Sequence, residues 1–304
     1  LEWMEDPWDD VAKSGEQLLR LAERVRPDCV HLNEFAHGAL PWAAPVLMVG
    51  HSCVLSWWRA VKGEPAPERY AEYRERVRRG LSGAQRVIAP SRAMLRMLSR
   101  LYGPLPSSRA IPNGVELRAF RPEEKSPLIV SAGRLWDEAK NVSMLAAVAP
   151  QLSWPVYVAG QSEAPHGTQA SLSGCELLGP LPRPQLAEVL ARASIYALPA
   201  RYEPFGLSIL EAAASGCALV LGRVPSLQEH WSDAALFVDP NDAEALQRGL
   251  SELIADPERR CALGRQAHAR AQSFGVQRMA AAYEREYQEL RADWTKQEPV
   301  QCAS

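Results

Sequence analysis

The stretch RYEPFGLSILE at residues 201–211 is the segment that best identifies the fold of this chain. A short apolar run at 195–198 precedes it and predicts a buried strand, and residues 207–215 predict a helix that ends before Gly216. The stretch is therefore a loop between a strand and the first turn of a helix. Such junctions bind ligands in α/β proteins, because helix N-termini at the carboxyl ends of parallel strands offer unpaired N–H groups to phosphates.

Two glutamates lie eight positions apart in this stretch. Glu203 is in the loop and Glu211 is on the predicted helix, so both can reach a ligand at the junction. Gly206 lets the backbone come close to that ligand. An arbitrary pair of glutamates is more often a surface acid and a solvated helix residue. Here the sequence Pro-Phe-Gly-Leu after the first acid favours a site.

Glu-x7-Glu with this flank resembles the donor-site signature of the retaining GT-B glycosyltransferases, most closely glycosyltransferase family 4. In that family the first glutamate contacts the donor sugar and the second holds the ribose hydroxyls. The resemblance implies these roles for Glu203 and Glu211. It also implies that the backbone at Phe205, Gly206 and Leu207 lines the donor site.

A second loop carries two cations directly after a predicted strand at 128–133. Its residues Arg134 and Lys140 resemble the family's G-R-L-x4-K loop, in which the arginine and lysine neutralise the donor diphosphate. A departing nucleoside diphosphate gains negative charge, and fixed cations stabilise that charge without proton transfer. Arg134 offers a planar fork and Lys140 a point charge.

The sequence predicts no metal and no cofactor besides the nucleotide-sugar substrate. There is no Asp-x-Asp motif, and the two cations would do the work of a metal. The six cysteines, at positions 29, 53, 175, 217, 261 and 302, have no metal or redox spacing. Most lie in apolar runs, so reduced and mainly buried thiols are expected.

The composition fits a globular protein of two ordinary domains, since 47% of the 304 residues are hydrophobic and 23% are charged. A formal net charge of −2 argues against a general nucleic-acid binder. No run of about 18 apolar residues predicts a transmembrane helix, and the acidic start is unlike a signal peptide. We expect a cytoplasmic protein. We also expect a further N-terminal piece, because the sequence begins with Leu1 and not Met, directly in front of a predicted helix.

The first part of the chain alternates helices and strands. Apolar spacing predicts a helix at 11–26, and short apolar runs predict strands at 29–32, 46–49 and 86–89. Ser91 is the predicted N-cap of the next helix. This alternation favours a parallel sheet.

His51 follows the strand at 46–49. A lone histidine is more often a packing residue than a catalyst, but the carboxyl end of a strand favours a site. In the family a histidine after this strand lies by the anomeric carbon, which implies that role for His51, although Ser52 replaces the Asp that often follows. His31 and His37 are weaker candidates for an acceptor pocket.

A basic patch lies on a predicted helix farther along. Its members are Arg69, Arg74, Arg76, Arg78 and Arg79. Some family members use such a surface to meet an anionic lipid or a phosphorylated acceptor, so the resemblance allows peripheral contact with the inner face of the membrane. Glu72 and Glu75 interrupt it, and that favours an ordinary solvated helix face.

Residues 111–115, Ile-Pro-Asn-Gly-Val, resemble the family's segment that leads out of the first domain. The predicted organisation is an acceptor-side domain at 1–122, a nucleotide-sugar domain at 123–275, and at 276–304 a helix that crosses back to the first domain plus a polar tail.

The second domain places its candidate residues at the ends of predicted strands. Arg134, Gly160, Glu203 and Gly222 each follow one, and this convergence comes from the pattern alone. Arg223 replaces the second glycine of the family's Gly-Gly-x-x-Glu pattern, which weakens a role for Gly222. Further strands are predicted at 156–159, 176–178, 218–221 and 236–238. Helices are predicted at 184–193, 257–271 and 276–290, and a capping box of Asn241 and Glu244 starts another.

The expected fold is α/β of the GT-B type, with two Rossmann-like, doubly wound parallel-sheet domains facing a cleft. The first domain is expected to be incomplete, because the family's first strand and its Gly-rich turn have no counterpart. The expected function is sugar transfer from a UDP-, GDP- or ADP-linked donor to an acceptor hydroxyl, with retention. Glu203, His51, Arg134 and Lys140 are the candidate catalytic residues.

Two alternatives stay open. One is a donor-binding but inactive truncated fragment, and the other is a GT-B-like nucleotide-sugar epimerase, for which the first domain offers no convincing acid/base pair. The acceptor, whether sugar, lipid or small molecule, is not specified by the sequence.

Overall fold

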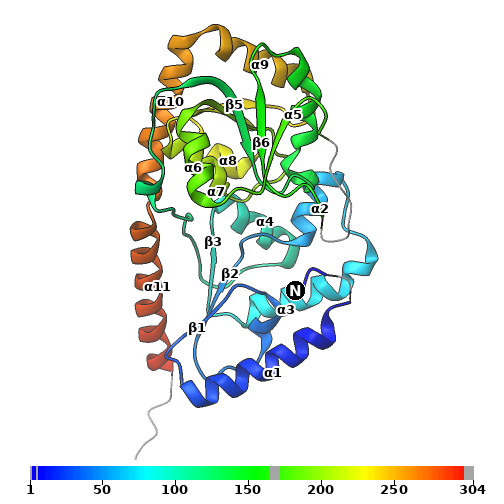
Figure 1. Cartoon of the computed structure of the whole chain (residues 1–304). Helices are drawn as coiled ribbons and strands as arrows, with labels where there is room; N and C mark the ends of the chain where they lie inside the picture. Colours follow the sequence, from blue (N-terminus) through cyan, green and yellow to red (C-terminus); the bar gives the residue numbers. More distant parts are fainter. Residues whose placement is uncertain (1, 5, 165–171, 298–304) are drawn as a thin grey trace, which may run out of the picture. The chain divides into compact units, whose positions relative to one another are not determined.

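The structure, a computed structural model, describes residues 2–4, 6–164 and 172–297, which form two compact units (Figure 1). Unit 1 comprises Leu1–Pro112 and Met279–Ser304, and unit 2 comprises Asn113–Arg278. Each unit is built on one parallel β-sheet, as the alternation of helices and strands predicts.

The strands of unit 1 lie in sequence order, β1-β2-β3-β4. They are β1 (Val30–Leu32), β2 (Val46–Val49), β3 (Arg86–Ala89) and β4 (Ser108–Ala110). The helices are α1 (Trp8–Val25), α2 (Val54–Lys62), α3 (Ala71–Gly83), α4 (Arg92–Tyr102) and α11 (Val276–Gln297), with the 3-10 turns η1 (Ala36–Ala39) and η2 (Glu68–Tyr70). Ser91 caps α4 as predicted, since its side chain accepts from Met94 N at 3.1 Å.

Alternate residues of β2 face two different hydrophobic clusters. Val46 and Met48 belong to a cluster that includes side chains of α2, α3 and α4. Leu47 and Val49 belong to a second cluster, against which α11 packs through Leu290 and several partly buried side chains. Because successive strand residues point to opposite faces, helices cover both faces of this sheet.

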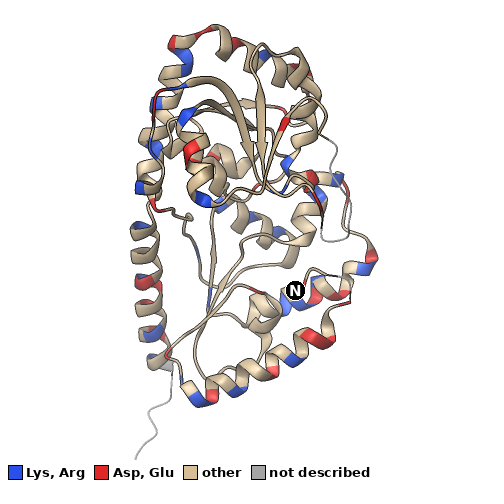
Figure 2. Cartoon of the chain, in the orientation of Figure 1, with Lys and Arg blue, Asp and Glu red and all other residues tan. Residues whose placement is uncertain are grey.

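Arg86 of β3 ties α11 to the sheet. Its side chain is only 5% exposed and is ion-paired with Glu286, while Glu289 Oε2 lies 3.5 Å from it and Asp293 Oδ2 3.9 Å. A buried charge is tolerated only with such partners. Both signs of charge are interspersed along α11 (Figure 2), and its acidic members supply the counterions of Arg86.

Four arginines of the basic patch lie on α3, while Arg69 lies on η2, and three of those on α3 are paired within the helix. Arg76 Nε lies 2.6 Å from Glu72, and Arg78 and Arg79 lie 2.8 and 2.7 Å from Glu75. The two guanidinium groups hold the pKa of Glu75 at about 2. This arrangement fits a solvated helix face, and membrane contact stays a prediction. No helix in the described ranges combines the length and hydropathy of a membrane-spanning segment.

The strands of unit 2 lie in the order β10-β9-β8-β5-β6-β7, all parallel. They are β5 (Ser126–Ala132), β6 (Val156–Ala159), β7 (Glu176–Gly179), β8 (Ala193–Leu198), β9 (Ala218–Gly222) and β10 (Ala235–Val238). The helices are α5 (Val142–Val148), α6 (Arg183–Arg192), α7 (Leu207–Ala214), α8 (Pro225–Trp231), α9 (Ala243–Ala255) and α10 (Pro257–Ala271), with the 3-10 turns η3 (Leu117–Ala119), η4 (Glu138–Lys140), η5 (Ala149–Gln151) and η6 (Gln272–Phe274).

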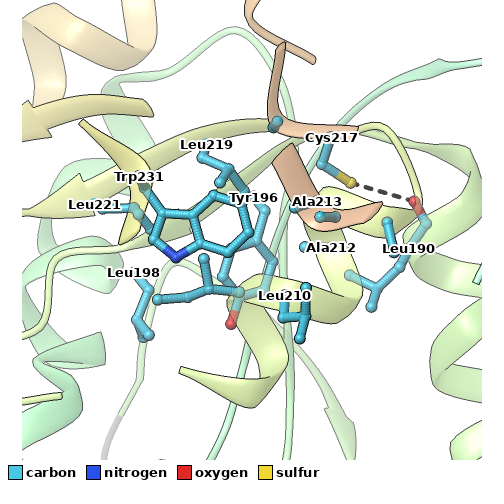
Figure 3. Close-up of a cluster of buried hydrophobic side chains, with 14 of the residues drawn as sticks. Leu190, Tyr196, Leu198, Leu210, Ala212, Ala213, Cys217, Leu219, Leu221 and Trp231 are labelled. Atoms are coloured by element: carbon cyan, nitrogen blue, oxygen red, sulfur yellow. Dashed lines mark hydrogen bonds between the residues drawn. The ribbon is translucent and has the colours of Figure 1, made fainter. Parts of the chain in front are cut away.

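The core of unit 2 is closely packed. Figure 3 shows Trp231 of α8 beside strand side chains that include Tyr196 and Leu221, all at most 1% exposed. The Cys217 thiol donates to the carbonyl oxygen of Leu190 at 3.3 Å. The other face of the same sheet packs against α5 and α9. Burial of both faces explains why the strands are continuous apolar runs in the sequence.

The strand order of unit 2 reverses between β8 and β5. The chain runs from β5 outward to β7 and then returns, so that β8 pairs with β5 on its other side. The loops after β5 and β8 therefore leave neighbouring strands in opposite directions. Such a switch point is where open α/β sheets bind ligands.

The units divide after Pro112, whereas the sequence suggests a boundary near 122. The intervening segment stays with unit 2 because Val115 N donates to Phe274 O at 3.1 Å and Val276 N donates to Val115 O at 3.0 Å. Residues of α11 from Met279 onward belong to unit 1.

Two local predictions are wrong. Asp242, not Asn241, caps α9, since Asp242 Oδ1 accepts from Ala245 N at 2.8 Å, and with Ala at position 245 this cap is not a capping box. The thiols are not mainly buried. The five described cysteines are all free, but only Cys53 and Cys217 are buried, and the exposed one, Cys261, is on α10. Position 302 lies outside the described residues.

Candidate functional site

The two loops at the switch point of unit 2 meet through an ion pair. Lys140, in the loop after β5, donates to the Glu203 carboxylate, in the loop after β8. The two side chains are 16% and 9% exposed. Backbone contact accompanies the pair, since Arg201 N donates to Ala139 O at 2.9 Å. The structure thus brings together two residues that the sequence separates by 63 positions.

Asp137 and Asn141 shape the loop that carries Lys140. Asp137 Oδ1 accepts from Ala139 N at 3.0 Å and so starts the turn η4. Asn141 has a left-handed backbone with φ of 55°, which asparagine tolerates better than most residues. Its amide donates to Pro199 O at 2.9 Å and Pro240 O at 2.8 Å. Neither residue is singled out by the sequence, although Asp and Asn in such loops are a known signal of side-chain-stabilised turns.

Arg134 is the exposed cation of the site. Its guanidinium donates to Asp137 Oδ2 at 2.8 Å and lies 5.4 Å from the centroid of the Trp136 ring. The Arg134 side chain is 61% exposed while that of Asp137 is 5% exposed. A solvent-facing arginine with one partner keeps donors available for an anion.

Two glycines allow the backbone to pass closely at the strand ends. Gly160 has φ of 142°, and a Cβ there would lie 1.8 Å from Gly133 O. At Gly222 a Cβ would lie 2.1 Å from Ala200 O. Any side chain at either position would collide with backbone. Gly222 is thus explained by packing between β9 and the loop after β8.

Helix α7 starts at the same place without a side-chain cap. Gly206, its N-cap residue, has φ of 89° and supplies no side chain, and Leu207 in the first turn is 48% exposed. Glu203 Oε1 accepts from Phe205 N at 3.3 Å. Phe205 is 3% exposed and its ring packs edge-on to His230, so the side chain serves packing.

Glu211 lies one turn into α7 and is partly buried. Its side chain is 15% exposed and lies 3.7 Å from Arg183 Nε at the start of α6. Burial raises the pKa of Glu211, and the positive charge of Arg183 partly offsets that rise. Tyr196 supports the same helix from below, because its hydroxyl lies 2.7 Å from Ser208 Oγ. Tyr196 was not predicted as part of the site.

His51 belongs to unit 1, where it follows β2. Its Nε2 lies 3.0 Å from Asn33 Oδ1. Burial, together with the nearby ring of His31, lowers the pKa of His51. The predicted catalytic set is therefore divided between two units, three residues in unit 2 and His51 in unit 1.

The two other histidines of unit 1 line one cavity but differ in role. The cavity has a volume of about 450 Å³ and includes Asn33 in its wall. His37 is buried, and its Nε2 lies 3.2 Å from Val11 O and 3.1 Å from Ser14 Oγ, so it serves packing. His31 is exposed and reaches the hydroxyl of Tyr287 at 2.7 Å.

No group of three metal-ligating side chains is found among the described residues. The ion pairs described at this site involve three cations, Arg134, Lys140 and Arg183, and three carboxylates, Asp137, Glu203 and Glu211. Cations at an uncapped helix start favour an anionic ligand, and carboxylates set back from them favour hydroxyl groups.

Two family profiles match the chain. Glycosyl transferases group 1 matches residues 115–270, and Glycosyltransferase Family 4 matches residues 4–119. The first match covers slightly more than half of the chain and contains every candidate residue of unit 2.

Curated relatives are similar over most of the chain. An alpha-maltose-1-phosphate synthase of Mycolicibacterium smegmatis is 26% identical over 260 residues, which cover 73% of this chain and 66% of the relative. A D-inositol 3-phosphate glycosyltransferase of Corynebacterium jeikeium is 29% identical over 196 residues, 64% of this chain and 42% of the relative. The chain thus spans less than two thirds of the length of these relatives.

Solved structures share the fold. A sucrose-phosphate synthase of Thermosynechococcus elongatus superposes with a TM-score of 0.82 at 22% identity, covering 95% of this chain and 80% of that one. Anabaena Alr3699/HepE in complex with UDP and glucose gives a TM-score of 0.74 at 15% identity, covering 95% and 84%. At this identity the likeness concerns the GT-B fold.

Proposed function

Because the chain belongs to the family Glycosyl transferases group 1, we propose that it transfers a sugar from a nucleoside-diphosphate donor to an acceptor hydroxyl, with retention at the anomeric carbon. The observation that carries this proposal is the Lys140–Glu203 pair at the switch point of unit 2. The pair places the cation proposed to bind the diphosphate directly beside the carboxylate proposed to bind the sugar.

In the proposed chemistry, three groups stabilise the negative charge that grows on the leaving diphosphate. Lys140 and Arg134 neutralise it as cations, and the free N–H groups at the start of α7 donate to it. No proton has to move for this stabilisation, so we propose that the reaction needs no metal. Lys140 also holds Glu203 in place while Glu203 accepts hydrogen bonds from the sugar hydroxyls.

The nucleoside binds through Glu211, the carboxylate farther along α7. Glu211 accepts from the ribose hydroxyls, and Gly160 lets the backbone approach the nucleotide closely. A neighbouring structure, that of Anabaena Alr3699/HepE, holds UDP and glucose, which supports a nucleotide donor for this fold. We assign the acceptor to unit 1, with His51 beside the anomeric carbon of the donor sugar.

The test is a calorimetric titration of the full chain with UDP, GDP and ADP, followed by hydrolysis of the matching sugar donors. We expect one nucleotide to bind and its donor to be hydrolysed slowly, with no loss on adding a chelator. Binding without turnover would favour an inactive donor-binding protein, and an isomerised nucleotide sugar would favour an epimerase. A folded sample that binds none of the three would contradict the assigned site.

Glu211 gives the nucleotide affinity a predictable pH dependence. Ribose hydroxyls donate to the ionised carboxylate, so affinity should fall as the pH drops through the raised pKa of Glu211, which is above the ordinary value of 4.5. Removing the offsetting charge with Arg183→Ala should move this fall to higher pH. Calorimetry between about pH 5 and 8 measures it.

Glu211→Gln is the control for that profile. It should bind the nucleotide about tenfold more weakly and should no longer lose affinity at low pH, because a neutral amide does not titrate there.

The pH dependence of folding stability has the opposite sign. The folded chain holds the Glu211 proton more tightly than the unfolded chain, so protonation relieves the burial penalty as the pH falls from the raised pKa towards 4.5. A weakening of binding at low pH that persists in Glu211→Gln would exclude Glu211 as its origin.

A further inference from the structure

The hydroxyl of Tyr196, a residue of β8, connects the end of β5 to the first turn of α7. Its oxygen lies 3.1 Å from the carbonyl oxygen of Ala132, the last residue of β5. It also lies 2.7 Å from Oγ of Ser208 in α7, and Ala132 N donates to it at 3.4 Å. One side-chain atom therefore joins the two segments from which the neighbouring loops of the site are built.

This connection lies at the switch point, where β5 and β8 separate. The register between the two strands ends with Val130 opposite Tyr196, although β5 continues to Ala132 and β8 to Leu198. Beyond that pair the Tyr196 hydroxyl bonds both the N–H and the C=O group of Ala132. Buried backbone groups need such partners, so the hydroxyl holds the end of β5 after the strand pairing has ended.

The hydrogen bonds of this hydroxyl have one consistent set of directions. A phenol has a single hydrogen and the carbonyl oxygen of Ala132 only accepts, so Tyr196 donates to Ala132. The Ser208 hydroxyl then donates to Tyr196. Tyr196 is fully buried, and burial raises its pKa, so the hydroxyl keeps its hydrogen. Figure 3 shows the Tyr196 ring among the packed side chains of the core, which fix the position of the hydroxyl.

We propose that Tyr196 and Ser208 are positioning residues that fix the spacing between Arg134 and the start of α7. The inference rests on the function proposed above, in which Arg134 and the free N–H groups of α7 stabilise one diphosphate. Only Gly133 separates Ala132 from Arg134 in the sequence. Ser208 belongs to the first turn of α7. A shift at either end of the connection would change the distance between groups that contact the same ligand, and small misplacements reduce rates strongly.

The experiment compares nucleoside diphosphates with monophosphates, because only the diphosphates carry both phosphates of the leaving group. The full chain is titrated with UDP and UMP, GDP and GMP, and ADP and AMP, and hydrolysis of the matching sugar donor gives kcat. Tyr196→Phe keeps the ring and removes the hydroxyl. We expect it to weaken diphosphate binding about fivefold, to change monophosphate binding by less than about twofold and to lower kcat about tenfold. A general loss of structure would weaken the binding of both nucleotides equally.

Ser208→Ala tests whether the two hydroxyls act through one hydrogen bond. Alone, it should lower the ratio of diphosphate to monophosphate affinity about threefold. Combined with Tyr196→Phe it should add no further loss, because the bond is already absent. Ser208→Thr keeps a hydroxyl and should retain the wild-type ratio. Additive losses in the double variant would mean that Ser208 acts independently of Tyr196, and they would overturn the proposal.

Ser194→Ala is the matched control, because Ser194 Oγ donates to Ser126 O at 2.6 Å and so joins the same two strands at their other ends. It should leave both affinities and kcat unchanged. An equal fall of the affinity ratio in Ser194→Ala and Tyr196→Phe would contradict a specific role of the Tyr196 hydroxyl.

Amide hydrogen exchange of the unliganded chain measures the connection itself. Tyr196→Phe should speed exchange in peptides that cover residues 131–136 and 206–211, and Ser194→Ala should not. The proposal is overturned if Tyr196→Phe leaves this exchange or the affinity ratio at the wild-type value. If the wild-type chain binds none of the six nucleotides, the proposed function fails and this proposal fails with it. Binding with an unchanged ratio would instead overturn the positioning role alone.

Discussion

Replacing Lys140 with methionine is expected to lower the rate of sugar transfer about 10³-fold, because it removes a fixed charge from the place where the leaving diphosphate becomes negative. Lys140 is only 16% exposed, so water replaces that charge poorly. Binding of the nucleotide should weaken as well, but less than the rate, since charge on the phosphate grows as the bond breaks. Calorimetry and donor hydrolysis measure the two effects separately.

The same substitution also affects folding, and a second variant separates the two effects. Lys140→Met leaves the Glu203 carboxylate, 9% exposed, without its cation, which we expect to destabilise the fold by about 3 kcal/mol. The double variant Lys140→Met/Glu203→Gln removes both charges and should recover most of that stability while staying inactive. Recovery of transfer in the double variant, or a single variant within threefold of the wild-type rate, would contradict the role of Lys140.

Gly160→Ala is expected to destabilise unit 2 by about 4 kcal/mol, the sum of backbone strain and overpacking. The residue has φ of 142°, which L-residues rarely adopt, and the new Cβ would lie 1.8 Å from Gly133 O. Relief requires the strand ends of β5 and β6 to separate, which displaces the loop that carries Lys140. Thermal unfolding should show a melting temperature lower by about 10 °C, together with weaker nucleotide binding.

Gly179→Ala provides the matched control. Gly179 O accepts from Gly160 N at 2.8 Å, so the two glycines are neighbours at the ends of β6 and β7. Gly179 also has a positive φ, of 68°, but a Cβ there meets nothing within 4 Å. We therefore expect only the backbone penalty, about 1 kcal/mol, and unchanged nucleotide binding. If both substitutions lowered the free energy of unfolding equally, backbone strain alone, and not the contact with Gly133, would account for the effect of Gly160→Ala.

The parts of the fold that the sequence predicts well are those whose signal is local. The predicted strands at 46–49, 86–89 and 156–159 match β2, β3 and β6, and the predicted helix at 257–271 matches α10. Runs buried on both faces have to be apolar, and their ends are marked by Gly or Pro.

Other features depend on contacts that a sequence does not display. Strand β4 has the polar sequence Ser-Arg-Ala and pairs only because β3 lies beside it, so periodicity gives no sign of it. Asn141 holds its loop by donating to the carbonyl oxygens of Pro199 and Pro240, and Pro240 is 99 positions away in the sequence. The ion pair between Lys140 and Glu203 was not predicted, because it depends on the pairing of β5 with β8, which neither loop sequence reveals.

The discontinuous make-up of unit 1 has a consequence for the order in which the chain folds during synthesis. Unit 2 is one continuous segment, Asn113–Arg278, whereas unit 1 needs residues from Met279 onward. The residues of unit 2 are therefore all synthesised before the acidic partners of Arg86 and before Tyr287, the partner of His31. A chain that stops after Arg278 would keep the nucleotide-binding loops of unit 2 and would leave Arg86 without Glu286 and His31 without Tyr287, so unit 1 depends on a segment that is synthesised after unit 2.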